Sequence, residues 1–226
     1  MKIISIGDIH GHTEWQSIDP SNYDHIVFVG DYCDGYGVPD EVEVQNLSDL
    51  IDLKKKHPEK VRLLLGNHDL HYIYYPGYQC GRYNPAIQPQ VTALFTSNES
   101  LFEIAFQVGS TLWTHAGISN RWLSQLPDAP SDKSTFAKHL TSIHADQNRR
   151  NILHQVGPLR RGSAPYGGIT WADKEETMND FPDGLHQIVG HSRADAVIPI
   201  VNATATGSIT YIDCLHSSGE FYEIEL

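Results

Sequence analysis

The stretch IVFVGDYCDGYG, residues 26–37, runs from an apolar segment directly into a turn that carries two carboxylates. Residues 26–29 are apolar, Gly30 follows them, and Asp31 and Asp34 come within the next four positions. A short apolar run that ends in turn residues is typical of a buried strand. Gly and Asp are also common turn formers, so the stretch taken alone favours a polar surface turn.

Two other stretches repeat this design of an apolar run, a glycine and then a polar residue. They are IISIGDIH (3–10) and RLLLGNHD (62–69). Residues 40–57, between the stretches 26–37 and 62–69, have their apolar side chains at helical spacing. Asp40 could cap this predicted helix and Pro58 could end it. Strands that alternate with helices predict βαβ units and a largely parallel sheet, so the predicted fold class is α/β.

The middle of the chain is predicted to be mostly helical. Apolar residues recur at helical spacing in 86–97 and in 132–153. The run 70–85 is rich in Tyr, with Gly and Pro between the aromatic residues, and predicts an irregular loop. Residues 101–114 predict a hairpin that turns near Gly109.

The C-terminal third alternates apolar and polar residues, which predicts paired antiparallel strands with turns near Gly207 and Gly219. A mixed sheet, or two sheets packed together between helices, fits this pattern best. A length of 226 residues suits one domain. We therefore expect a single domain over residues 1–226, with the aromatic loop 70–85 and a helical insert of about 86–160.

The composition disfavours several classes of protein. Hydrophobic residues make up 40% of the chain, enough for a sizeable core, and the net charge of -12 disfavours non-specific nucleic-acid binding. Cys33, Cys80 and Cys214 form neither a disulfide framework nor a zinc-ribbon pattern. The apolar start of the chain is too short for a signal peptide and no run reaches membrane-spanning length. We therefore expect a cytoplasmic protein with no membrane partner.

Five predicted strand ends carry side chains that can bind metal ions. In open α/β sheets, sites form beyond the carboxyl ends of the strands, where such side chains meet. Carboxylate, imidazole and amide donors suit Mn, Fe or Zn, and the set is too large for one tetrahedral ion. Two ions that share a bridging carboxylate would use it well, as in phosphatases. The side chains are Asp8, His10, Asp31, Asp34, Asn67, His68, Asp69, His115 and His191.

The motifs GDIHG, GDYCD, GNHD, THAG and VGHS, in this order over residues 7–192, resemble those of the calcineurin-like metallophosphoesterases. They are most similar to the branch that contains Ser/Thr protein phosphatases and bacterial diadenosine tetraphosphatases. The resemblance extends over residues 1–226. It implies a four-layer α-β-β-α sandwich with mixed sheets and a site for two divalent metal ions, with Mn favoured and Fe or Zn as alternatives.

The resemblance also implies a role for each matching residue. His68 would protonate the leaving alkoxide, and Asp34 would orient His68. A histidine held by a carboxylate can be kept charged and correctly turned, which fits this pair on chemical grounds as well. The implied metal ligands are Asp8 and His10 for the first ion, Asp31 as the bridge, and Asn67, His115 and His191 for the second.

Each of these residues also has a structural explanation when it is taken singly. Asp8, Asp31 and Asn67 could cap helices that follow their strands. A lone histidine is more often a satisfied interior residue than a ligand. The joint occurrence of the motifs favours the site.

The implied activity is a dinuclear-metal-dependent phosphoesterase that hydrolyses phosphate monoesters, with a Ser/Thr-type protein phosphatase as the main hypothesis. The substrate would be a phosphorylated small molecule, peptide or protein. The alternative is a hydrolase of dinucleoside polyphosphates or nucleotides. Nothing in the sequence indicates an oligomeric state.

One departure from the family pattern affects the substrate prediction. Protein phosphatases of this branch usually place a phosphate-binding Arg where this chain has Gly35. Arg160 and Arg161 are the best replacements, because Arg can bind phosphate through two nitrogens. Arg82 and Arg193 are weaker candidates.

Two unrelated functions compete with the phosphoesterase hypothesis. GHSRA (190–194) approaches a nucleophile elbow at Ser192, with Asp213 and His216 following in the order of α/β-hydrolases. Its fifth position is Ala194, and the acid and histidine lie only three residues apart, which argues against an acyl hydrolase. A catalytically silent binding module would be expected to have lost ligands, whereas every expected ligand is present.

Overall fold

The computed structural model describes all 226 residues, Met1–Leu226. The fold is α/β with two five-stranded mixed sheets. The first sheet has the order β10-β1-β2-β3-β4, and the second has the order β5-β6-β7-β9-β8. The strands are β1 (Lys2–Ile6), β2 (His25–Phe28), β3 (Val61–Leu64), β4 (Phe102–Glu103), β5 (Phe106–Val108), β6 (Thr111–Trp113), β7 (His186–Val189), β8 (Ile198–Val201), β9 (Ser208–Tyr211) and β10 (Tyr222–Glu225).

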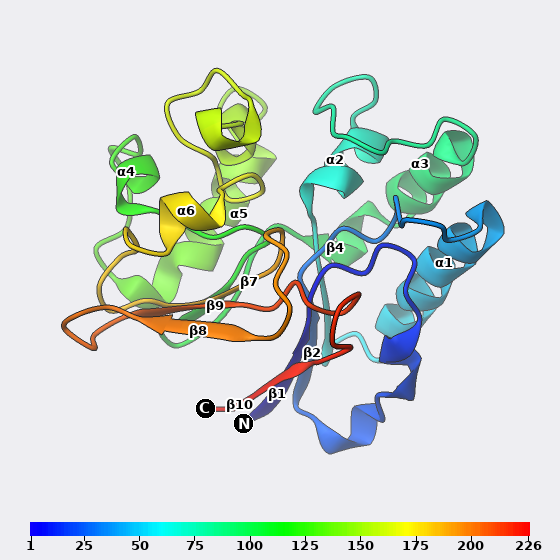
Figure 1. Ribbon diagram of the computed structural model, residues 1–226, viewed down its shortest axis with the longest axis horizontal. Coiled ribbons are helices and arrows are strands. Elements are labelled where there is room, and N and C mark those ends of the chain that lie inside the picture. Colours follow the sequence, from blue (N-terminus) through cyan, green and yellow to red (C-terminus); the bar gives the residue numbers. More distant parts are fainter.

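Helices cover the outer faces of the two sheets. Figure 1 shows α1 and α3 beside the first sheet and α4, α5 and α6 beside the second. The α-helices are α1 (Asp40–Lys56), α2 (Asn67–Ile73), α3 (Gln88–Ser97), α4 (Asn120–Leu123), α5 (Phe136–Ala145) and α6 (Lys174–Thr177). Short 3-10 helices are η1 (Glu14–Ser17), η2 (Pro20–Asn22), η3 (Glu99–Leu101), η4 (Lys133–Thr135), η5 (Arg150–His154) and η6 (Pro158–Arg160).

A compact apolar cluster joins the two sheets face to face. It draws on strands of both sheets, and its eight buried members expose 8% of their surface or less. Apolar side chains of both inner faces interdigitate in this way when two sheets pack together. The predicted arrangement of two sheets between helical layers is therefore confirmed. The cluster consists of Ile3, Val27, Val29, Leu64, Phe106, Trp113, Ile188 and Ile212.

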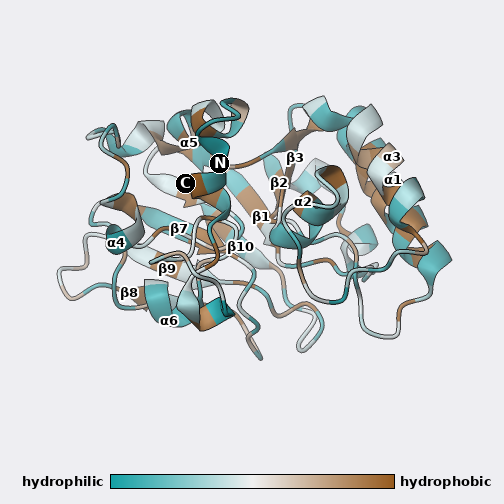
Figure 2. Cartoon of the chain, turned by 90° about the horizontal axis from the view of Figure 1, so that it is seen from above, coloured by the Kyte–Doolittle hydropathy of each residue, from teal (hydrophilic) through white to brown (hydrophobic).

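Helix α1 follows the sequence pattern closely. Its first turn is acidic and its last turn is the basic run 54–56, which complements the helix dipole. Leu47, Leu50 and Ile51 are buried on one side, and Figure 2 shows hydrophilic and hydrophobic residues together in this helix. Asp40 is the first helical residue and not the cap, because the extended Pro39 occupies the cap position.

The middle of the chain is less helical than expected. The predicted helix 86–97 is present as α3, but 132–153 divides into η4, α5 and η5. The predicted hairpin is β5–β6, which turns at Gly109 with φ +57°. The range 86–160 thus holds β4, β5 and β6 between its helices.

The C-terminal strands pair differently from the prediction. β8 and β9 are antiparallel neighbours, as expected, but β9 also pairs in parallel with β7. β10 leaves that sheet and pairs antiparallel with β1 of the first one. The turn near Gly219 is therefore a crossing between sheets and not a hairpin.

The chain ends meet beside this pairing. The amino group of Met1 lies 2.6 Å from the carbonyl oxygen of Leu226, and the two ends adjoin in Figure 1. No helix of the protein combines the length and the apolar character needed to cross a bilayer.

The topology brings the predicted strand ends together. β1, β2 and β3 are mutually parallel in the first sheet, and β6 and β7 are parallel in the second. Parallel strands present their carboxyl ends at one edge of a sheet. Residues after β1, β2, β3 and β7 line one cavity, which is described next, and His115 after β6 lies buried beside Asp31.

Candidate active site

The turns that follow the strands hold their functional side chains in unusual backbone conformations. His10, Asp31, Asp34 and His191 have φ of +42°, +55°, +68° and +64°. Non-glycine residues in this left-handed region cost about 1–2 kcal/mol each, and they persist where surrounding structure imposes them. Four predicted site residues with this strain indicate that the turns are shaped for the side chains they present.

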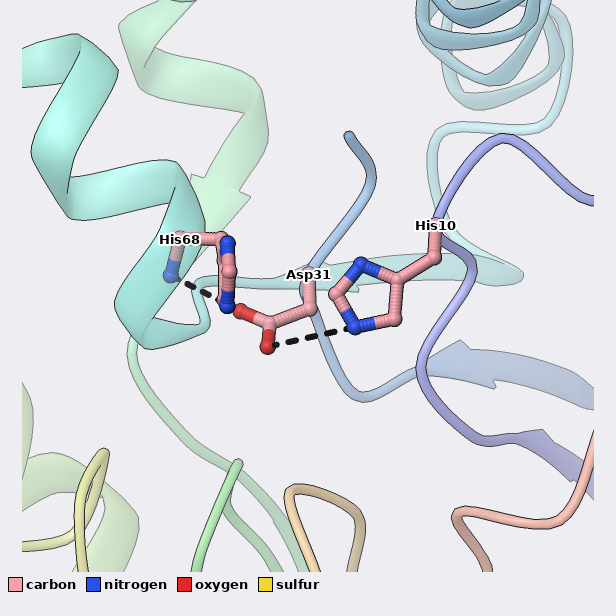
Figure 3. Close-up of side chains that lie close together, drawn as sticks. All are labelled: His10, Asp31 and His68. Atoms are coloured by element: carbon pink, nitrogen blue, oxygen red, sulfur yellow. Dashed lines mark hydrogen bonds and ion pairs between the residues drawn. The ribbon is translucent and has the colours of Figure 1, made fainter. Parts of the chain in front are cut away.

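Asp31 lies at the centre of the site. Its Oδ1 accepts a hydrogen bond from the backbone N–H of His68 at 2.9 Å. Its Oδ2 lies 3.4 Å from Nε2 of His115 and 3.9 Å from Nε2 of His10. Figure 3 shows Asp31 between His10 and His68. Burial by itself raises the pKa of Asp31, but the surrounding histidines outweigh it and hold this pKa well below its usual value.

His10 and Asp8 face Asp31 from the turn after β1. Nδ1 of His10 donates to the carbonyl oxygen of Cys33 at 2.6 Å, so the neutral ring has its lone pair on Nε2. That Nε2 lies 3.9 Å from Oδ2 of Asp8. Burial lowers the pKa of His10 to about 3, so the ring is a neutral electron-pair donor at physiological pH. Asp8 is fixed in turn by the backbone N–H of His191, which donates to its Oδ1 at 2.9 Å.

Three further ligand candidates converge on the other side of Asp31. His115 donates from Nδ1 to the carbonyl oxygen of Val29 at 2.8 Å, and its Nε2 lies 3.0 Å from Oδ1 of Asn67. Burial alone would lower the pKa of His115, but Asp31 and Asp8 raise it to about 10. Nε2 of His191 is buried and has no hydrogen-bond partner.

These residues fit divalent metal ions. The Nε2 lone pair of a neutral His115 would face Oδ1 of Asn67 and Oδ2 of Asp31, and three electron-rich atoms at this distance need a proton or a cation between them. An orphaned polar atom at full burial, such as Nε2 of His191, also calls for a partner. Ligating atoms of Asp31, His115 and His191 lie within 4.8 Å of one another, as do those of His10, Asp31 and His68. Imidazole and oxygen donors of this kind suit Mn, Fe and Zn.

Glycines leave room for the carboxylates. A Cβ at residue 66 would lie 2.1 Å from Oδ1 of Asp31, and one at residue 190 would lie 2.2 Å from Oδ1 of Asp8. Both distances are far below van der Waals contact. Gly66 and Gly190 are therefore required by the close approach of the backbone to these two side chains.

His68 is held by a buried chain of hydrogen bonds. Its Nδ1 lies 2.6 Å from Oδ2 of Asp34, and the hydroxyl of Tyr72 donates to Oδ1 of the same carboxylate. Burial lowers the pKa of His68, but Asp31 and Asp34 outweigh it and raise the pKa above its usual value. These contacts favour the protonated form of the ring and fix its direction.

Asp69 supports the turn that carries Asp31. Its carboxylate accepts hydrogen bonds from the backbone N–H groups of Asp31, Tyr32 and Gly66 at 2.8, 3.0 and 2.7 Å. It therefore links the turns after β2 and β3, and it is fully buried away from the cavity.

The site opens into a polar cavity of about 350 Å³. Arg82, Arg160 and Arg193 line it, whereas Arg161 is exposed and does not. Nη2 of Arg82 donates to Nε2 of His10 at 3.1 Å. The complete lining is Asp8, His10, Asp31, Tyr36, Asn67, His68, Gly81, Arg82, Arg160, Trp171, His191, Arg193 and Asp213.

The structure explains why residue 35 is not an arginine. A Cβ at Gly35 would lie 2.1 Å from the carbonyl oxygen of His10 and 2.7 Å from Cγ2 of Val38. In addition, the N–H of Gly35 donates to Oε1 of the α1 residue Glu43 at 2.5 Å. Any side chain here would displace the turn that carries His10, so the arginine of the family pattern has no room at this position.

Some lining residues were not predicted as part of the metallophosphoesterase site. Asp213 follows β9 and is 3% exposed, and burial together with Asp31 raises its pKa to about 6. Tyr36, at 80% exposure, and Trp171 are the aromatic members of the lining. The sequence contained a sign of this position, because Asp213 directly follows the run SITYI (208–212), as the other site residues follow their strands.

Ser192 has none of the partners of a nucleophilic serine. Its Oγ accepts from Nη2 of Arg160 at 2.8 Å and from the N–H of Lys174 at 3.1 Å. His216 is exposed and its Nε2 contacts Oγ of the adjacent Ser217. No hydrogen bond joins Ser192 to a histidine, and a serine without a nearby base is a weak nucleophile.

Comparison with known proteins agrees with this geometry. The family model described as calcineurin-like phosphoesterase matches residues 1–192. The chain belongs to this family. Membership indicates a hydrolase that acts on phosphoesters. The match ends one residue after His191, so it contains all of the predicted metal ligands.

Individual relatives of the chain are distant. A curated protein of Schizosaccharomyces pombe named "Putative serine/threonine-protein phosphatase C22H10.04" is 25% identical over 192 residues, covering 79% of this chain. The chain spans about half the length of that relative, 52%.

Two solved structures share the fold of this calcineurin-like phosphoesterase. One is a mutant of a cold-active protein tyrosine phosphatase, with a TM-score of 0.56 and 18% identity, and the other is the cold-active protein-tyrosine phosphatase of a psychrophilic Shewanella species, with 0.53 and 17%. Each alignment includes 99% of this chain and 75% of the chain in the solved structure.

Proposed function

We propose that the protein is a metal-dependent phosphomonoesterase that binds two divalent ions and acts on phosphorylated peptides or proteins. The observation that carries the proposal is the position of Asp31. Its Oδ2 lies within 4 Å of Nε2 of both His10 and His115, which belong to opposite sheets. A carboxylate between two groups of imidazole and oxygen donors is the natural bridge for two cations.

The remaining ligands would divide between the two ions. Asp8 and His10 would hold the first, and Asn67, His115 and His191 the second. When bound, such ions lower the pKa of a water molecule toward neutrality and neutralise charge on the phosphoryl group. The unpartnered Nε2 of His191 supports this assignment, because a metal would satisfy it.

His68 would deliver the proton that the leaving oxygen needs. Its hydrogen bond to Asp34 fixes the ring and favours the protonated form, and Tyr72 fixes Asp34. A positioned general acid of this kind contributes typically ~10²–10⁴ in rate. His68 would also contact no metal in this role, since its proton has to reach the substrate.

Arg82 and Arg160 would bind the phosphoryl oxygens in place of the arginine that Gly35 excludes. Both line the cavity beside the proposed ligands. Arg160 is oriented by Asp173, whose Oδ2 lies 2.6 Å from its Nε. The presence of Arg193 as a third cation in the lining also favours a second candidate, hydrolysis of dinucleoside polyphosphates, which carry more negative charge.

A substrate panel tests the proposal and separates the two candidates. The protein would be loaded with Mn²⁺ and assayed on phosphoserine, phosphothreonine and phosphotyrosine peptides, diadenosine tetraphosphate and nucleoside monophosphates. We expect the highest kcat/KM on a phosphopeptide. Preference for diadenosine tetraphosphate would select the second candidate, and no turnover of any phosphoester would reject the proposed activity.

Metal content is measured on the same samples. We expect two Mn²⁺ per chain in the parent protein and fewer in Asp31→Asn, since loss of a bridging charge weakens both sites. A stoichiometry that does not change in this variant would contradict the bridging role.

A further inference from the structure

A second group of metal-ligating atoms lies beside the proposed dinuclear site and contains none of its proposed ligands, although it includes the proposed acid His68. A ring nitrogen of His68, a carboxylate oxygen of Asp34 and Sγ of Cys80 lie within 4.8 Å of one another. His71 adds a fourth donor, because its Nδ1 lies 3.5 Å from Sγ of Cys80. Three of the four residues expose 7% of their surface or less, and Cys80 is half-buried at the side of the loop.

The fold assembles this group from three segments. His68 and His71 are three residues apart on α2, so they lie on the same helix face. The loop after α2 returns to the helix, and the N–H of Cys80 donates to Nδ1 of His71 at 3.3 Å. Asp34 comes from the turn after β2. The ring of His71 is itself packed against Tyr83, with ring centroids 4.1 Å apart.

The donor chemistry differs from that of the dinuclear site. One thiolate, two imidazoles and one carboxylate form a set that prefers zinc over manganese, because a soft sulfur ligand selects Zn²⁺. In a tetrahedral zinc site the donor atoms lie about 3.5 Å apart, and the distance between Cys80 Sγ and His71 Nδ1 already has this value. The His68–Asp34 distance of 2.6 Å would have to widen by roughly 1 Å.

We propose that Asp34, His68, His71 and Cys80 form an inhibitory zinc site adjacent to the catalytic centre. Zinc would replace the proton that His68 and Asp34 share and the proton of the Cys80 thiol, and both protons would pass to the solvent. A histidine ligated in this way can no longer be oriented and charged by Asp34. The inhibition rests on the proposed role of His68, whereas the binding of zinc does not.

Cobalt spectroscopy tests the site without any assay of activity. Co²⁺ replaces Zn²⁺ in such sites, and a thiolate ligand gives an intense charge-transfer band in the near ultraviolet that oxygen and nitrogen ligands do not. We expect the band on addition of Co²⁺ to the Mn²⁺-loaded parent protein and its loss in Cys80→Ser. The matched control is Cys214→Ser, which removes a buried thiol that is outside this group and contacts the carbonyl oxygen of Glu220, and it should keep the band.

Absence of the band in the parent, or its persistence in Cys80→Ser, would overturn the proposal. The result is informative even if the protein hydrolyses no phosphoester, so failure of the proposed function and failure of the zinc site are distinguishable. His71→Gln is the second variant and should weaken cobalt binding at least tenfold while leaving the thiol in place.

Inhibition is measured on the Mn²⁺-loaded enzyme with an aryl phosphate, each protein being normalised to its own rate without zinc. We expect half-inhibition of the parent at a free Zn²⁺ concentration at least tenfold lower than for Cys80→Ser or His71→Gln. Equal zinc sensitivity of the three proteins would contradict an inhibitory role for the site.

Discussion

Nδ1 of His68 and Oδ2 of Asp34 are joined by a buried hydrogen bond of 2.6 Å, formed between the N-terminal turn of α2 and the turn after β2. The carboxylate is shared with the hydroxyl of Tyr72, which donates to the other oxygen. Both side chains are almost fully buried. The pair is therefore rigid, and the ring of His68 lines the cavity.

Replacement of His68 by Asn should reduce kcat by about 10²–10⁴ with metal content unchanged, since a general acid typically contributes that much. The loss should depend on the leaving group, because an alkyl alkoxide needs the proton far more than a nitrophenolate does. We would compare kcat for phosphoserine and for nitrophenyl phosphate. An equal loss on both substrates would contradict the role of acid, and a loss of bound metal would indicate a ligand instead.

Removal of metal ions should abolish hydrolysis, whereas Ser192→Ala should retain most of it. Oγ of Ser192 accepts hydrogen bonds from Arg160 and from the backbone of Lys174, with no histidine to activate it. The expected change in kcat for this variant is less than about fivefold, through the altered position of Arg160. Full activity after dialysis against a chelator, together with an inactive Ser192→Ala protein, would establish an acyl-hydrolase-type mechanism.

The proposed metal ligands could be predicted from the sequence because the signal is local. Asp8, Asp31 and His191 each follow an apolar run and a glycine. Parallel pairing places Asp8 and Asp31 at one edge of the first sheet, and packing of the second sheet on the first brings His191 to them. The layered fold with mixed sheets could be predicted from the same pattern of strands and helices.

Contacts between distant segments could not be predicted in this way. The hydrogen bond from Tyr72 to Asp34 spans 38 positions and depends on how α2 lies over the turn after β2. Arg82 reaches His10 only because its loop folds back with a left-handed residue at this position, φ +60°. Asp213 joins the cavity because β9 inserts in parallel beside β7, where the pattern predicted only antiparallel neighbours.

Gly35→Ala should destabilise the protein by about 1–3 kcal/mol, the usual cost of overpacking. The added Cβ would lie 2.1 Å from the carbonyl oxygen of His10, so the turn that carries this proposed ligand has to move. Urea unfolding gives the free energy, and metal content should fall as well. The matched control is Gly81→Ala, where a Cβ meets nothing within 4 Å and the change should stay within about 0.5 kcal/mol. Similar values for both variants would contradict the steric explanation.

Stability should fall as the pH is lowered from about 6.5 toward 4. Burial lowers the pKa of His144 to about 4, below the usual value of 6.5 that the unfolded chain retains. Between these values the unfolded state binds the proton and the native state does not, so the free energy of unfolding increases with pH. The slope is at most about 1.4 kcal/mol per pH unit for one such group.

His144→Gln isolates this contribution. The variant removes the titrating group, whose Nδ1 contacts Nε2 of His154 at 3.3 Å. We expect a shallower dependence of the free energy of unfolding on pH between 4 and 6.5, measured by urea denaturation at a series of pH values. An unchanged slope would show that other groups account for the acid sensitivity.

Arg82→Ala and Arg160→Ala should each raise KM for a phosphoester and weaken product inhibition by inorganic phosphate, both by about tenfold, or roughly 1.4 kcal/mol. Both arginines line the cavity, and Gly35 leaves no room for the phosphate-binding residue expected there. Arg161→Ala is the matched control, because Arg161 adjoins Arg160 but is exposed and outside the cavity lining. If Arg161→Ala raised the inhibition constant for phosphate as much as Arg160→Ala did, the loop of η6 would have to move on binding. If Arg82→Ala left that constant unchanged, its contact with His10 would serve only to position the loop.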